Sequence, residues 1–95
     1  MEEIESSISE AIENINKILQ QETFAAYSDV LAGLTLALKL VHQGDLNSAQ
    51  KHLFHSFRIL REAPPRDNEL GYDTLVKIDT ASKLILNQLN QENLL

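Results

Sequence analysis

The chain has 95 residues, 43% of them hydrophobic and 23% charged, and its formal net charge is −6. This is the size of one small domain, and a core of that size leaves little room for a deep substrate pocket, which argues against an enzyme. The acidic balance argues against a nucleic-acid partner, and the absence of cysteine excludes disulfides and thiolate zinc sites.

An isoleucine-rich stripe opens the chain. Its members recur at alternating spacings of four and three residues: Ile4, Ile8, Ala11, Ile15 and Ile18. This spacing predicts a helix with one apolar face. Residues 20–23 contain neither glycine nor proline, so two interpretations stay open. We expect a break near 21–24 with Thr23 as the N-cap, and the alternative is one helix of roughly forty residues.

The next segment, VLAGLTLALKLV at residues 30–41, has one charge in twelve positions. Thr35 and Lys39 are its polar residues, and they lie four apart on one side of a helix. A helix that is apolar nearly all round must be covered nearly all round.

A short turn follows this segment. Gly44 is expected as the left-handed residue after the helix, and Asp45 as the N-cap of the next one. So short a turn makes the two helices an antiparallel hairpin over about 24–62. The hairpin's second helix ends before Pro64 and Pro65, because proline lacks the N–H and clashes with the preceding turn.

The last helix follows residues 66–69, with Asp67 or Asn68 as its cap, and the tail at 90–95 is expected to fray. No segment alternates with period two, so we predict an all-α fold. The chain is expected to be a single domain over 1–95, a three- or four-helix bundle built around the central hairpin. Six residues are predicted to be buried: Leu34, Leu38, Leu53, Phe57, Ile78 and Ile85.

The hairpin from Gly33 to Leu60 resembles a single tetratricopeptide repeat. The residues that carry the resemblance are Leu36, Ala37, Leu40, the turn at 43–45, Ala49 and Leu53. The sequence departs from the repeat where Gly33 replaces the usual tryptophan and Ser56 the second alanine. The resemblance implies protein–protein binding through a helical surface.

Three interpretations of the apolar segment stay open. In a homodimer, a second copy packs on the uncovered side, and Gly33 and Ala37 form a small step that admits it closely. Alternatively, three helices of the same chain wrap the segment, or a helix of another protein fills a groove beside it. We expect the homodimer, because Leu31 and Leu38 would otherwise form an exposed apolar patch. Further apolar positions lie outside the main stripes: Phe54, Ile59, Val76 and Leu86.

Charge is unevenly distributed along the chain. Residues 1–30 carry seven acidic side chains against Lys17, whereas residues 31–66 are net positive. The basic residues of the hairpin's second helix and the following loop are Lys51, Arg58, Arg61 and Arg66. Two interpretations stay open: acidic and basic helices lie side by side and pair internally, or the basic face docks an acidic or phosphorylated partner.

We therefore expect a non-enzymatic module for protein–protein interaction, an adaptor or regulator. Its partner is itself, another protein or both, and no cofactor, metal, membrane or small-molecule substrate is expected. The alternative is a small helical metal-binding protein or enzyme that uses His52 and His55, which lie three apart on one helix. A cytoplasmic location is expected, since residues 1–5 are acidic and 30–41 is shorter than the about 20 residues that span a bilayer.

Overall fold

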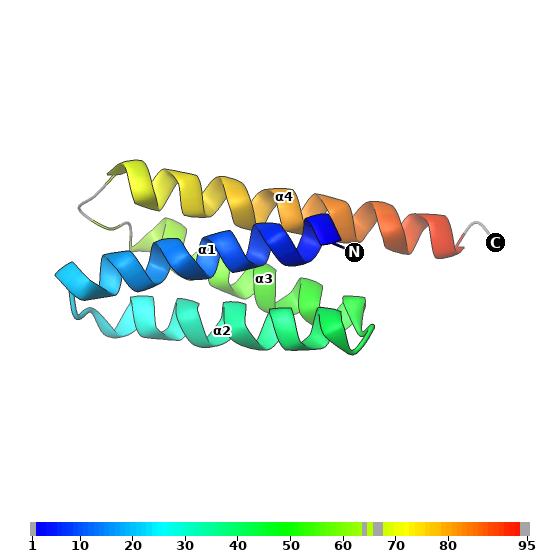
Figure 1. Cartoon of the computed structure of the whole chain (residues 1–95), viewed down its shortest axis with the longest axis horizontal. Coiled ribbons are helices and arrows are strands. Elements are labelled where there is room, and N and C mark those ends of the chain that lie inside the picture. The colour runs from blue at the N-terminus through cyan, green and yellow to red at the C-terminus, as the bar shows by residue number, and fades with distance from the viewer. Residues whose placement is uncertain (1, 64, 66–67, 94–95) are drawn as a thin grey trace.

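The computed structural model describes residues 2–63, 65 and 68–93, which form four α-helices and no strand (Figure 1). The helices are α1 (Glu2–Gln21), α2 (Ala25–His42), α3 (Leu46–Glu62) and α4 (Asn68–Asn93). The predicted all-α bundle is confirmed, and the hairpin expected over about 24–62 is formed by α2 and α3.

Successive helices run in opposite directions and surround a shared core (Figure 1). Each helix packs against two neighbours, in the order α1, α2, α3, α4 and back to α1. The diagonal pairs are therefore α1 with α3 and α2 with α4. Because α2 has two neighbours, the interpretation in which three helices wrap it is wrong. The last turns of α4 extend beyond the other three helices (Figure 1).

The break between the first two helices is confirmed, but Thr23 is not the cap. Residues 22–24 lie outside both helices, and Phe24 is the N-cap of α2 with extended backbone angles of φ −88° and ψ 130°. No side chain accepts a hydrogen bond at this cap. Instead the Phe24 ring lies 5.9 Å from that of Tyr27, centroid to centroid. The polar N-cap that the sequence predicted is therefore not formed, and the Phe24 ring packs beside Tyr27 in the first turn of α2.

The turn between α2 and α3 follows the prediction. Gly44 has a φ of +81°, a conformation that costs glycine little. Asp45 is the N-cap of α3, and its Oδ1 accepts a hydrogen bond of 3.2 Å from the Ser48 N–H.

The loop before α4 is described only in part. Pro64 and Asp67 lie outside the described residues, and Asn68 is the first residue of α4. This helix continues to residue 93, and residues 94 and 95 of the tail also lie outside the described part.

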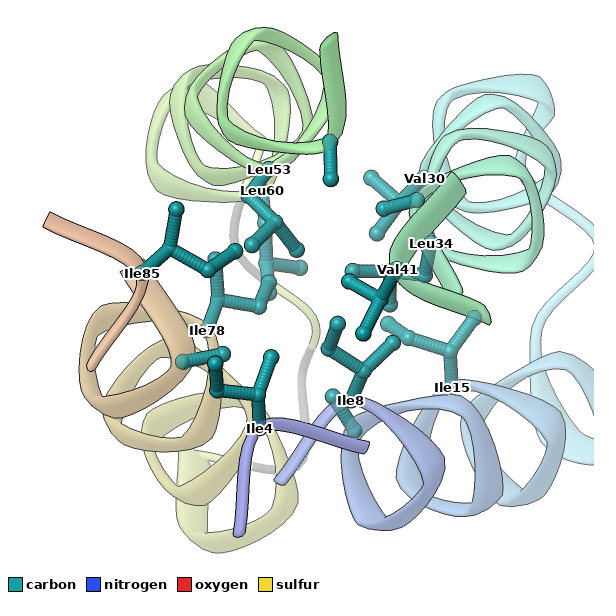
Figure 2. Close-up of a cluster of buried hydrophobic side chains, with 14 of the residues drawn as sticks. Ile4, Ile8, Ile15, Val30, Leu34, Val41, Leu53, Leu60, Ile78 and Ile85 are labelled. Carbon is teal, nitrogen blue, oxygen red and sulfur yellow. The ribbon is translucent and has the colours of Figure 1, made fainter. Parts of the chain in front are cut away.

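The core is made by one apolar stripe from each helix. Figure 2 shows isoleucines of α1 and α4 pointing toward aliphatic side chains of α2 and α3. Four of the predicted core residues are confirmed as buried: Leu34, Leu53, Ile78 and Ile85. The predictions for Leu38 and Phe57 are wrong, because both side chains lie at the edge of the core and are only half-buried.

Polar contacts join α4 to its two neighbours. The Asn14 Nδ2 donates to Asp73 Oδ2 at 2.7 Å between α1 and α4, and Gln50 Nε2 donates to Ser82 Oγ at 2.6 Å between α3 and α4. Lys77 Nζ lies 3.0 Å from the Glu10 carboxylate, and this contact raises the pKa of Lys77. These directional contacts fix the position of α4 along the bundle.

Leu53→Ala tests the packing of the hairpin. The side chain is fully buried, so we expect the free energy of unfolding to fall by about 2–5 kcal/mol. Leu36→Ala, at a position 40% exposed on α2, is the matched control and is expected to change stability by roughly 0.5 kcal/mol. Urea unfolding followed by circular dichroism gives both values. Equal effects at the two positions would show that the placement of Leu53 is wrong.

Candidate protein-binding face

The apolar segment 30–41 is covered mainly by its own chain. Its inward face comprises Val30, Leu34, Ala37 and Val41, all fully buried. His42 Nε2 lies 3.5 Å from the Glu5 carboxylate, which identifies the flank of α2 that faces α1. Leu38 lies one turn before His42, and Leu31 lies two turns before Leu38, so both follow this flank. Both are half-buried against the core.

The predicted small step faces α3 of the same chain. A Cβ added to Gly33 would overlap Ser56 Oγ, and it would lie 3.7 Å from Ser56 Cβ and 3.8 Å from the His52 carbonyl oxygen. Ala37 follows one turn later and is fully buried. Gly33 and Ala37 therefore permit a close crossing of α2 and α3, which is the geometry that the sequence analysis assigned to a second copy.

The outer edge of α2 carries Ala32, Thr35, Leu36 and Lys39, all exposed. Two of these side chains are polar and one is small, and Leu36 is 40% exposed. Leu36 is thus the single large apolar side chain among the exposed positions of this segment, and Leu31, Leu38 and Leu40 are half-buried against the core.

A larger apolar surface lies where α3 meets α4. The hydrogen bond from Gln50 to Ser82 identifies the two flanks that face each other. Phe54 and Phe57 lie one and two turns after Gln50 on α3, and Leu86 lies one turn after Ser82 on α4. Because the two helices are antiparallel (Figure 1), Leu86 is on the other side of the Gln50–Ser82 contact from the two phenylalanines. Phe54 is 62% exposed and Leu86 is 46% exposed. We call this surface the α3–α4 groove.

Two hollows indent the α3–α4 groove. The first has a volume of about 150 Å³ and is lined by Leu53, Phe54 and Phe57 of α3 and by residues 78, 79 and 82 of α4. The second, of about 240 Å³, lies nearer the turn between the helices, and its apolar lining includes Leu60, Tyr72 and Leu75. Tyr72 is 71% exposed. Apolar side chains thus continue along the groove.

Basic side chains border this surface on the α3 side. Arg58 and Arg61 line a depression together with Phe54, Phe57 and Glu62. Arg58 lies 3.9 Å from Glu62 of the same helix, in a pair whose side chains are both largely exposed. Such pairs are typically worth little. The α3 edge of the groove is therefore positively charged.

Among the described residues, the basic side chains of α3 make no ion pair with the acidic α1. The acidic α1 is diagonally opposite α3 and does not contact it. Among the described residues, Lys51 and Arg61 have no ion-pair partner. Asp79 of α4 pairs with Lys83 at 2.8 Å, and Arg66 lies outside the described residues. Of the basic side chains of α3, Arg58 thus pairs only with Glu62 of its own helix, and Lys51 and Arg61 have no carboxylate partner among the described residues.

The histidines occupy separate surroundings. His52 is half-buried, His55 is exposed, and His42 faces Glu5 of α1. In the described part of the chain, no group of three or more His, Cys, Asp or Glu side chains is placed to hold a metal ion.

Sequence reasoning noticed Phe54, Leu86 and the two arginines but did not join them. It placed Phe57 in the core and Tyr72 beside the apolar stripe of the last helix, whereas Tyr72 is 71% exposed. The signal that unites the α3 residues is their spacing, since Phe54, Phe57, Arg58 and Arg61 follow the i, i+3, i+4, i+7 pattern of one helix face. The hydrogen bond between Gln50 and Ser82 shows that this face borders α4, which the spacing alone does not reveal.

Comparison with protein-family models, curated proteins and solved structures gave no match. None of the helices described is long and apolar enough to cross a membrane. The resemblance to a tetratricopeptide repeat stays a prediction.

Gly33→Ala tests the close crossing of α2 and α3. In the natural chain the new methyl group overlaps Ser56 Oγ, so we expect destabilisation by about 1–3 kcal/mol. In a Ser56→Ala background the neighbour at 3.7 Å is an ordinary contact, and the helix propensity of alanine should then stabilise the protein by up to about 1 kcal/mol. Thermal unfolding of the four proteins measures this coupling. If Gly33→Ala changes the stability equally with Ser56 and with Ala at position 56, the close crossing of α2 and α3 is contradicted.

Proposed function

We propose that this chain is a non-enzymatic protein–protein interaction module, an adaptor or regulator, that binds a helix of another protein in the α3–α4 groove. The observation that carries the proposal is the exposed Phe54 beside Arg61, whose charge has no partner among the described residues. Aromatic residues and arginine are enriched in protein interfaces, where they supply much of the binding energy.

The shape of the groove supports a helical partner. Two roughly antiparallel helices with an apolar seam between them accept the apolar face of a third helix, as in other helix-in-groove interactions. Such a partner would cover Phe54, Tyr72 and Leu86, which are otherwise exposed to water. Burial of this apolar area would favour the complex.

Self-association through residues 30–41 stays a prediction. The residues assigned to it are Leu31, Gly33, Ala37 and Leu38, and the structure places them inside or at the edge of the core of one chain. The metal-binding or enzymatic alternative that uses His52 and His55 also stays untested, and no observation on these residues favours it.

Substitution in the groove tests the proposal. Wild-type protein, Phe54→Glu and the matched control Leu36→Glu on α2 are each immobilised and exposed to cell extract. We expect partners held by the wild type and by the control to be lost from Phe54→Glu, since removal of a buried aromatic anchor costs about 2 kcal/mol or more. Circular dichroism verifies that both variants are folded. Partners that stay on Phe54→Glu but leave Leu36→Glu would contradict the proposal.

A further inference from the structure

The two hollows of the α3–α4 groove have a definite spacing. Leu53 lines the first and Leu60 lines the second, and both are fully buried residues of α3. They are seven residues apart, which along a helix corresponds to roughly 10.5 Å. A second helix lying along the groove reaches both hollows with side chains one heptad apart.

The hollows suit side chains better than a small molecule. Their volumes of about 150 and 240 Å³ lie below the roughly 300–1,000 Å³ of typical ligand pockets, whereas the depression bordered by Arg58 and Arg61 has about 480 Å³. Their walls are largely apolar, with Phe54 and Phe57 at the first and Leu75 and Tyr72 at the second. Each hollow therefore suits one large apolar side chain.

The charge of the two edges differs. On the α3 edge, Arg61 has no ion-pair partner among the described residues and Arg58 has only the exposed contact with Glu62. On the α4 edge, Asp79 lines the first hollow and lies 2.8 Å from Lys83 in an exposed pair of the same kind. A partner helix thus gains from carboxylates along the side that lies over α3, and not along the other side. A second copy that laid its own α3 edge over this α3 edge would bring like charges together.

Resting on the proposed function, we infer that the partner segment is an acidic amphipathic helix of another protein. It places two large apolar side chains one heptad apart in the two hollows, and Asp or Glu side chains beside Arg58 and Arg61. The apolar contacts supply the affinity, and the one-sided charge sets the orientation of the helix and its rate of association.

The probe is a fluorescent helical peptide of about 18 residues, or five turns, with leucines one heptad apart and glutamates on one flank. Matched peptides carry lysine in place of glutamate, or leucines five residues apart. We expect the acidic heptad peptide to bind wild-type protein, measured by fluorescence anisotropy. The lysine peptide and the five-residue spacing should each weaken binding by about tenfold or more.

Charge reversal in the protein identifies the contact. Arg61→Glu should weaken binding of the acidic peptide by about tenfold and improve binding of the lysine peptide, whereas Lys39→Glu on the outer edge of α2 should change neither. The effect of Arg61→Glu on the affinity for either peptide should largely vanish in about 1 M NaCl, where the Debye screening length is about 3 Å.

The outcomes separate this inference from the proposed function. Phe54→Glu should abolish binding of every peptide. If Phe54→Glu abolishes binding but Arg61→Glu and Lys39→Glu have the same affinity for the acidic peptide, the groove binds helices and the inference of an acidic partner is wrong. If Phe54→Glu leaves binding unchanged, or if no peptide binds, both are overturned. If the free protein sediments as a dimer that Phe54→Glu dissociates, a second copy occupies the groove and the inference is also wrong.

Discussion

The close crossing of α2 and α3 at Gly33 and Ser56 determines how the rest of the bundle is arranged. Because a side chain is missing at Gly33, the two helices approach until Ser56 is fully buried. Among the described residues, the Ser56 hydroxyl is a buried polar group without a hydrogen-bond partner, which is energetically unfavourable. The apolar side of α2 is thereby covered within the chain. The helices α3 and α4 pack less extensively, as do α1 and α2, and the two hollows indent the seam between α3 and α4.

The order of the helices then determines which charged side chains find an ion-pair partner on a neighbouring helix. Acidic α1 contacts α2 and α4, so Lys77 of α4 and His42 of α2 pair with its glutamates. The basic residues of α3 lie across the core from α1 and cannot reach them. A chain with a net charge of −6 therefore keeps a positive edge beside the exposed Phe54. Apolar area with a rim of uncompensated charge is the usual make-up of a binding face.

Periodicity and turn chemistry predicted the fold well, because each helix has an apolar stripe and the turn at Gly44 and Asp45 admits few alternatives. The neighbours of each helix were harder to predict. Small residues such as Gly33 and Ala37 mark a close helix crossing but do not say whether the other helix belongs to the same chain. Likewise Phe57 lies on the apolar side of α3, yet the open seam leaves it half-exposed. In both cases the sequence shows the apolar face of a helix but not the neighbour that covers it.

Thiol labelling tests most directly whether α2 is covered while the α3–α4 groove is open, since the natural chain has no cysteine. Single variants Val41→Cys, at a fully buried position, and Phe54→Cys, at a position 62% exposed, are reacted with a thiol reagent in native buffer and in denaturant. The account predicts that Val41→Cys reacts at least about a hundredfold more slowly in the native protein than in denaturant, whereas Phe54→Cys reacts at nearly the same rate in both. Fast native labelling of Val41→Cys, or equal protection at the two positions, would contradict it.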